Sequence, residues 1–197
     1  MKDRLWLIMV VLAVALGMAA VPSGAKEWKG IDFPDQIRLD DATLVLNGLG
    51  LRQATALKVK VYIAGLYVVD RSGDPRAILE SPTPKRLVLH FLRNVGSSDL
   101  TKAWDDGFEN NAAAEIPVLR ERIEKIKSFT KDMETGQKLI FTYKPGAGIE
   151  VEIDGAVMGT VEGDDFSKAF LSIWLGPNPP NQKLKDGLLG AIDLQRS

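Results

Sequence analysis

The sequence contains no cysteine and a single histidine, His90, among its 197 residues. Without cysteine the chain forms neither disulfides nor iron–sulfur clusters, and thiol catalysis is excluded. One histidine is too few for a histidine metal cage or for a two-histidine proton relay. No zinc-ligand spacing, calcium loop or nucleophile elbow is present in the sequence either. We therefore expect neither a metal nor a cofactor.

A strong charge of one sign is also missing. Lysine and arginine together number 25 against 26 aspartates and glutamates, which gives a formal net charge of −1. A nucleic-acid-binding domain is usually basic, so the sequence predicts no nucleic-acid partner. Because disulfides are excluded, the hydrophobic core alone must hold the folded chain together.

Residues 1–25 have the pattern of a secretory signal peptide. Two basic residues precede an apolar run over residues 5–21, and residues 23–25 supply the small side chains that a signal peptidase reads. The alternative is an uncleaved membrane anchor, although the run is just under the roughly 20 residues that span a bilayer comfortably. We predict cleavage after Ala25, no stable membrane anchor afterwards, and a periplasmic or secreted protein. Residues 26–197 are then expected to form a single domain.

Alternation of apolar and polar residues predicts a series of short strands. Two of their connections carry turn signals, Asp40-Asp41 in the first hairpin and Asp154-Gly155 in a later one. Residues 28–35 are interpreted as a lead-in to the first strand. The predicted strands are residues 36–39, 43–46, 58–69, 86–92, 138–144, 149–153 and 156–161.

Helical spacing of apolar residues predicts the remaining elements. A short helix begins at Asp74-Pro75, where aspartate caps and proline suits the first turn. Two longer helices follow, from Ser97 and over about residues 116–129. Another helix begins at Asp164-Asp165, and a last one runs from Asn181 to about residue 189. Strands, two helices, a meander and two further helices together indicate an α+β fold, an antiparallel sheet with helices on one face.

The most informative stretch is LNGLGLRQATALKVKVYIAGLY, residues 46–67. Gly48 and Gly50 do not form a phosphate loop, because a later glycine is missing and a strand, not a helix, follows. We interpret them as a tight turn or a bulge. Arg52 lies next to them in apolar sequence, where an arginine is costly to bury without an anionic partner. It is either a solvated charge at a strand edge or the polar anchor of a pocket.

Arg52 and Tyr62 form the main candidate pair. If the strands on which they lie are antiparallel neighbours, both side chains can face the helix-covered side of the sheet. An arginine fork and a phenol are well suited to a carboxylate or phenolate oxygen. The structural alternative is a solvated Arg52 and a Tyr62 that packs in the core.

Large apolar side chains gather on the predicted helices. Core packing explains them by default, and the alternative is that some line a slot between helices and sheet, because ligand pockets are mostly apolar. These helical aromatic residues are Trp104, Phe108, Phe166, Phe170 and Trp174.

His90 lies in a predicted strand without an assignable pocket or orienting partner, both of which a general base needs.

Three segments resemble the chalcone isomerase superfamily. They are LNGLGLRQATALKVKVYIAGLYVV, which is similar to its glycine–glycine–x–arginine strand pair, and SDLTKAWDDGFENN and FSKAFLSIWLGPNPPNQKLKDGLLG, which are similar to its later helices. The likeness extends from about residue 31 to 190 and is greatest to the bacterial, exported chalcone isomerase-like proteins. It implies an open-faced β-sandwich, a large antiparallel sheet covered on one face by helices, with a ligand cleft between them.

The resemblance also places the family's cleft residues on this sequence. The arginine, threonine and asparagine of the plant isomerases correspond to Arg52, Tyr62 and Asn110. Their catalytic tyrosine, their lysine and the polar residue of their late helix fall at Ala103, Asp106 and Ile173. Half of these positions lose their chemistry, and a site that stabilises a developing anion would not replace a lysine by an aspartate. Chalcone isomerase activity is therefore not expected.

Plastid fatty-acid-binding proteins of the same superfamily keep the arginine, and the resemblance favours a binder of a small amphipathic anion such as a fatty acid. One alternative is an isomerase, an intramolecular lyase, that acts on an unknown enone-like substrate with Arg52 and Tyr62 as electrophilic groups. The other is a structural or interaction protein whose cleft is filled by its own side chains. The expected ligand-binding residues are Arg52, Tyr62 and Asn110 at the head group, with Trp104, Phe108 and Phe170 at the tail.

Overall fold

The computed structural model describes residues 24–54 and 57–192. The predicted signal peptide lies almost wholly outside these residues. Within them, none of the helices combines the length and the hydropathy that crossing a bilayer requires.

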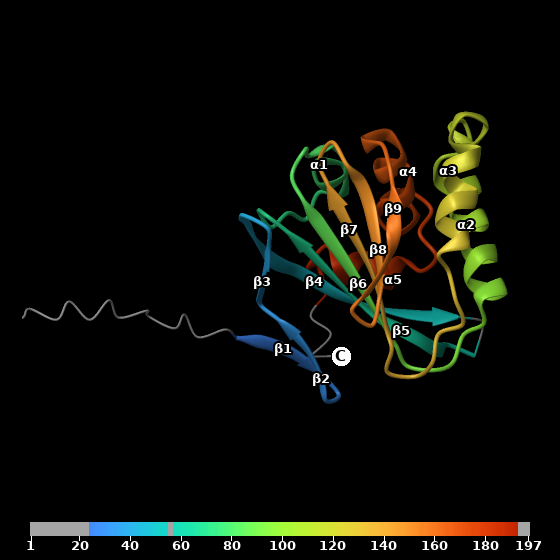
Figure 1. Ribbon diagram of the computed structural model, residues 1–197. Coiled ribbons are helices and arrows are strands. Elements are labelled where there is room, and N and C mark those ends of the chain that lie inside the picture. Colours follow the sequence, from blue (N-terminus) through green and yellow to red (C-terminus); the bar gives the residue numbers. More distant parts are fainter. Residues whose placement is uncertain (1–23, 55–56, 193–197) are drawn as a thin grey trace, which may run out of the picture.

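A seven-stranded antiparallel sheet forms the centre of the molecule (Figure 1). Its strands follow one another in chain order, and each neighbouring pair is antiparallel. Both predicted turns are present, and the sheet continues through them. The strands are β3 (Gln36–Leu39), β4 (Ala42–Ala54), β5 (Val59–Val68), β6 (Lys85–Phe91), β7 (Lys138–Lys144), β8 (Gly148–Ile153) and β9 (Ala156–Val161).

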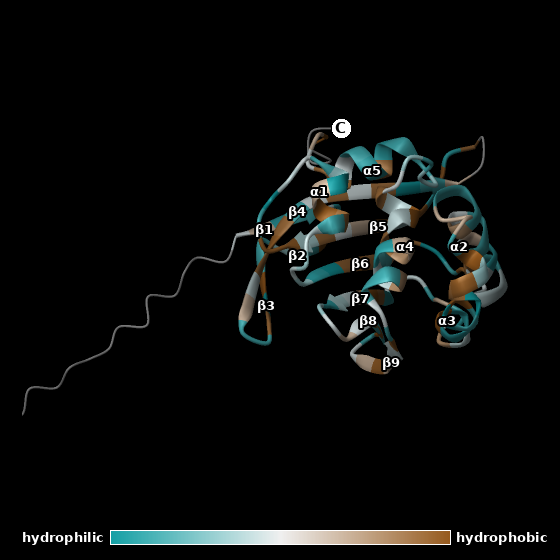
Figure 2. Ribbon diagram, turned by 90° about the horizontal axis from the view of Figure 1, so that it is seen from above, coloured by the Kyte–Doolittle hydropathy of each residue, from teal (hydrophilic) through white to brown (hydrophobic). Residues whose placement is uncertain are grey.

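Five helices complete this part of the chain. The Asp74 carboxylate caps the first helix by accepting from the backbone N–H of Arg76 at 2.9 Å, and Asn181 caps the last through Leu184 in the same way. Seen from above, α2 and α3 lie on the opposite side of the sheet from the two strands that precede it, β1 (Ala25–Trp28) and β2 (Ile31–Pro34) (Figure 2). The helices are α1 (Pro75–Glu80), α2 (Ser97–Asn111), α3 (Ile116–Ser128), α4 (Asp164–Leu175) and α5 (Gln182–Leu188).

The main hydrophobic core lies between the sheet and the helices. Side chains of β5 alternate, so that Tyr62, Ala64 and Leu66 face this core while Ile63 and Tyr67 face the other side. Aromatic rings fill the space beneath α2 and α4, with ring centroids 4.7 to 6.1 Å apart, and most of these pairs are tilted or edge-to-face. The α+β architecture with helices on one face is thus confirmed.

The other face of the sheet is partly covered by a hairpin that the sequence did not predict. Strands β1 (Ala25–Trp28) and β2 (Ile31–Pro34) pair with each other, where we expected a lead-in. Phe33 packs so closely on Gly65 that a Cβ at that glycine would lie 2.6 Å from its ring. Trp28 and Phe33 are buried in a second, smaller core on this face.

The two glycines of β4 let helix α5 lie directly on the strand. A Cβ at Gly48 would lie 2.1 Å from the Gly187 carbonyl oxygen, and one at Gly50 would lie 2.2 Å from that of Leu184. The predicted bulge occurs one residue earlier, at Asn47, and the strand runs through both glycines without a turn. The Asn47 side-chain amide donates to the carbonyl oxygen of Leu188 at 2.7 Å, which ties the bulge to α5.

Candidate functional site

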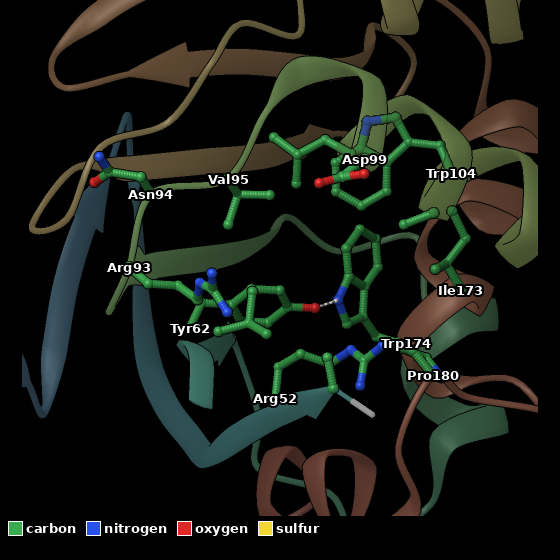
Figure 3. A pocket seen from close by; sticks show the side chains of 14 residues that line it. Arg52, Tyr62, Arg93, Asn94, Val95, Asp99, Trp104, Ile173, Trp174 and Pro180 are labelled. Carbon is green, nitrogen blue, oxygen red and sulfur yellow. Dashed lines mark hydrogen bonds between the residues drawn. The ribbon is translucent and has the colours of Figure 1, made fainter. Parts of the chain in front are cut away.

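A pocket of about 290 Å³ opens between the β4–β5 end of the sheet and helices α2 and α4 (Figure 3). Its wall is mostly apolar, with a few charged and polar side chains near the rim, which is the usual composition of a small-molecule site. The lining residues come from five separate parts of the chain. They are Arg52, Ala54, Val61, Tyr62, Arg93, Asn94, Val95, Asp99, Leu100, Ala103, Trp104, Ile173, Trp174 and Pro180.

A second bulge shapes the floor of this pocket. Arg52 is paired with Tyr62 across β4 and β5, but the next pair is Gln53 with Lys60, so that Val61 is an extra residue. A bulge interrupts the alternation of side chains. As a result Val61 and Tyr62 both line the pocket, whereas Lys60 reaches Trp28 on the opposite face. The expectation that Arg52 and Tyr62 lie on neighbouring antiparallel strands and share a face is confirmed.

Tyr62 is a buried hydrogen-bonding group in the pocket wall. Its hydroxyl oxygen accepts from the indole Nε1–H of Trp174 at 3.0 Å (Figure 3). Burial raises the pKa of Tyr62 to about 12, an effect that the Trp174 hydrogen bond and the nearby Arg52 charge partly oppose. The phenol therefore keeps its proton at neutral pH, and among the described residues no acceptor takes that proton. It is available to a ligand oxygen.

Arg52 lies at the pocket with much of its donor capacity unused. Its guanidinium donates to the neighbouring carbonyl oxygen of Gln53. Within residues 24–54 and 57–192, no carboxylate lies within ion-pairing distance of Arg52 or of Arg93, the second arginine of the lining. Arg52 is half-buried and Arg93 exposed. Two unpaired cations, against the single carboxylate of Asp99 in a mostly apolar lining, favour an anionic ligand with an apolar body.

Trp104 forms another part of the wall. Its indole Nε1–H donates to the Thr130 hydroxyl at 3.2 Å, which fixes the ring. The ring centroid lies 5.4 Å from that of Trp174, the hydrogen-bond partner of Tyr62. The two indoles thus connect the pocket with the aromatic core behind it.

Three of the six predicted site residues lie elsewhere. Phe108 and Phe170 are buried in the aromatic core, where they contact each other and Phe166 and do not line the pocket. Asn110 is exposed near the end of α2, where its backbone carbonyl oxygen accepts from the side chain of Asn178 at 2.9 Å. The helical spacing that suggested Phe108 and Phe170 describes a buried face, and it does not distinguish core from cavity, whereas Asn110 was expected from the family resemblance alone.

The pocket also contains residues that the sequence did not single out. Arg93 and Val95 follow β6, where no pattern marks them, whereas Trp174 was assigned to the inner face of its helix without a role. Ala103 and Ile173 line the pocket, while Asp106 does not and instead pairs with Lys102 at 3.0 Å on the surface of α2.

Neither His90 nor a cluster of metal ligands forms a further site in the described part of the chain. His90 lies on β6, and its Nδ1 atom is buried without a hydrogen-bond partner there. Burial, with the Lys138 charge adding to the effect, lowers the pKa of His90. Acidic and histidine side chains do not cluster as metal ligands anywhere in residues 24–54 and 57–192.

Comparison with known proteins agrees with this architecture. Residues 25–190 match the family model described as chalcone isomerase-like, and the protein therefore belongs to the chalcone isomerase-like family. Among solved structures it is similar to a fatty-acid binding protein of Arabidopsis thaliana, with 16% sequence identity and a TM-score of 0.67 over 85% of this chain and 97% of that chain. At this identity the similarity establishes the fold alone. A search of curated proteins finds no match.

Proposed function

We propose that the protein is an exported, periplasmic binding protein for a small amphipathic anion, most simply a fatty acid. The ligand's carboxylate lies at Arg52, and its hydrocarbon tail occupies the apolar part of the pocket. The family and the fold are compatible with this function, since the Arabidopsis thaliana protein of the same fold is a fatty-acid binding protein. The signal-like pattern of residues 1–25 supports the location.

The observation that carries the proposal is the cross-strand pair of Arg52 and Tyr62. A half-buried guanidinium without an ion-pair partner is stabilised when a carboxylate accepts its hydrogen bonds. The Tyr62 hydroxyl, oriented by Trp174, supplies a second donor directed at the same anion. The Tyr62 hydroxyl keeps its proton over the physiological pH range, because its pKa is raised to about 12.

The size of the pocket bounds the ligand. At roughly 30 Å³ for each water-sized group, a volume of about 290 Å³ holds on the order of ten heavy atoms. A carboxylate with a chain of medium length fills this space, and the tail packs against Val61, Trp104 and Ile173.

A lyase on this scaffold would need groups that the pocket lacks. The positions that carry a tyrosine and a polar side chain in the plant isomerases, by the resemblance described above, are Ala103 and Ile173, which have no exchangeable side-chain proton. Tyr62 is a poor general base, because its raised pKa keeps it protonated. These features favour binding over catalysis.

The proposal is tested with the protein purified from the periplasmic fraction, first by native mass spectrometry and then by titration with brominated fatty acids. Trp104 and Trp174 line the pocket, so a bromine atom on the tail should quench tryptophan emission. We expect a co-purifying acid and saturable quenching. Arg52→Ala should weaken binding at least tenfold, since a hydrogen bond to a charged group contributes about 1.5–3 kcal/mol.

Arg38→Ala is the matched control, because Arg38 is exposed on β3, outside the pocket lining. It should bind the acid as the wild type does. Equal binding by Arg52→Ala and wild type would refute the role of Arg52. Turnover of a chalcone by the wild type that stops in Tyr62→Phe would replace the binding proposal with the lyase alternative.

A further inference from the structure

Three lysines lie on the β4–β5 and β1–β2 hairpins, in or close to their turns. Lys60 lies at the start of β5, Lys58 lies in the turn just before that strand, and Lys29 lies in the turn between β1 and β2. All three are exposed, and within the part of the chain that the structure describes none of them pairs with a carboxylate. With the neighbouring Leu57 they form a group that we call the basic tip.

Trp28 holds two of these lysines together. The Nζ atoms of Lys29 and Lys60 each lie 5.4 Å from the centroid of its indole ring, a distance typical of a cation–π contact. The pKa of Lys60 is lowered because the Lys29 side chain lies beside it. Two ammonium groups brought together in this way repel each other, and an anion between them would remove the repulsion.

An exposed apolar side chain accompanies these charges. The side chain of Leu57 is 86% exposed, the largest value among the exposed large hydrophobic residues described. Lysine ammonium groups beside a protruding leucine match the boundary of an anionic bilayer, where phosphate groups lie above acyl chains. The charge is local, because the whole chain has a formal net charge of −1.

The basic tip and the pocket lie on the two faces of the same hairpin end. Lys60 is paired with Gln53, next to Arg52, and the bulge at Val61 sends Lys60 to one face and Val61 to the pocket. A surface that approaches this hairpin end therefore meets the basic tip within a few residues of Arg52 and Ala54 at the pocket rim.

We propose that Lys29, Leu57, Lys58 and Lys60 dock the protein on an anionic phospholipid bilayer and bring the pocket close to the membrane surface. The lysines bind lipid phosphates, and Leu57 enters the acyl boundary. This docking does not require a bound ligand in the pocket, so it can be tested independently of the fatty-acid proposal.

Co-sedimentation with vesicles tests the proposal, with phosphatidylcholine alone and with phosphatidylcholine mixed with phosphatidylglycerol. The protein from the periplasmic fraction should bind the mixed vesicles, and added salt should weaken the binding. Lys29→Ala/Lys60→Ala should lower the partition coefficient about 30-fold, from the typical contribution of a lysine near an anionic surface. Leu57→Ser should lower it about tenfold without changing the salt dependence.

The matched control is Arg120→Ala/Lys125→Ala, which removes two exposed charges from α3, outside the basic tip. It should bind the mixed vesicles as the wild type does, and so should wild-type protein from which any bound fatty acid has been extracted. Equal loss in the control pair overturns the proposal, as does wild-type binding that ignores phosphatidylglycerol. Dimerisation that depends on Lys29 and Lys60, without vesicle binding, would instead assign the basic tip to a second copy of the chain.

Discussion

Helices α2 and α4 cover two regions that use aromatic side chains in different ways. In the closed region, Phe108, Phe166 and Phe170 pack against one another without solvent exposure beyond 1%. In the open region, Tyr62 and Trp174 form a wall of the pocket and meet through a hydrogen bond. The same kind of amphipathic helix face supplies both regions, so the helices do not determine which becomes a cavity.

Strand β4 shows a similar contrast along its own length, where α5 packs on it. In β4, Gly48 and Gly50 admit α5 into backbone contact, and no space remains there. Two residues later the strand carries Arg52, opposite a bulge in β5, and the helices no longer close on it. Small residues in the sheet thus produce close packing, whereas a charged residue and a bulge leave a hollow.

The largest effect is expected from truncation in the closed region. Phe170→Ala should lower the free energy of unfolding by about 3–5 kcal/mol, because it leaves a large cavity among fixed aromatic neighbours. Urea denaturation measures the loss. Phe170→Leu keeps most of the volume and should cost clearly less. If Phe170→Ala kept its stability and lost the ligand, Phe170 would belong to the pocket and not to the closed region.

Gly50→Ala should lower the free energy of unfolding by about 2–3 kcal/mol, because its Cβ would lie 2.2 Å from the carbonyl oxygen of Leu184 and α5 would have to move. Thermal unfolding measures this change. Gly73→Ala is the control, since its nearest neighbour would be the carbonyl oxygen of Leu189 at 3.8 Å. Similar melting temperatures for both variants would show that α5 adapts, which the close packing of this region does not predict.

Tyr62 should make the open region sensitive to alkali. Its pKa is raised from 10.0 to about 12, so the stability that its protonated form contributes is complete below pH 10 and is lost as the pH rises through 12. Linkage gives a loss of about 2 kcal/mol by pH 12. Denaturation curves of wild type and Tyr62→Phe should therefore converge over this range, because phenylalanine does not titrate. Parallel curves would contradict the burial of the hydroxyl.

The smallest effect on stability is expected at Arg52. Arg52→Ala should change the free energy of unfolding by less than about 0.5 kcal/mol, because the side chain is half-buried and lacks an ion-pair partner in the described chain. Chemical denaturation without ligand measures it. A loss above about 2 kcal/mol would make Arg52 a structural residue and weaken the contrast between the two regions.

Local sequence signals account for much of the fold. Asp40-Asp41 and Asp154-Gly155 mark real turns, and the Asp74 and Asn181 caps are present. The β1–β2 hairpin was missed because its burial depends on contacts with Gly65 and the far face of the sheet. The function of the β4 glycines was also missed, since the helix that lies on them follows more than 130 residues later.

The candidate site was predictable at its polar centre and less so at its walls. Arg52 and Tyr62 are unusual in their sequence surroundings, and antiparallel pairing of adjacent strands was enough to bring them together. Phe108 and Phe170 carry the same helical signal as Trp104, although Trp104 alone of the three reaches the pocket. Arg93 lies after β6 without any local signal, so its place in the lining follows from tertiary structure alone.

The extra residue at Val61 shifts the side-chain alternation of β5 by one position. From Tyr62 onward, every second side chain faces the core, whereas Lys60, before the bulge, faces the opposite side of the sheet. Substitutions in the short first segment can thus alter what the hairpin end presents on either face without shifting a core residue. The bulge thus separates the side-chain pattern of the hairpin end, where we propose that ligand and membrane bind, from the pattern that builds the core.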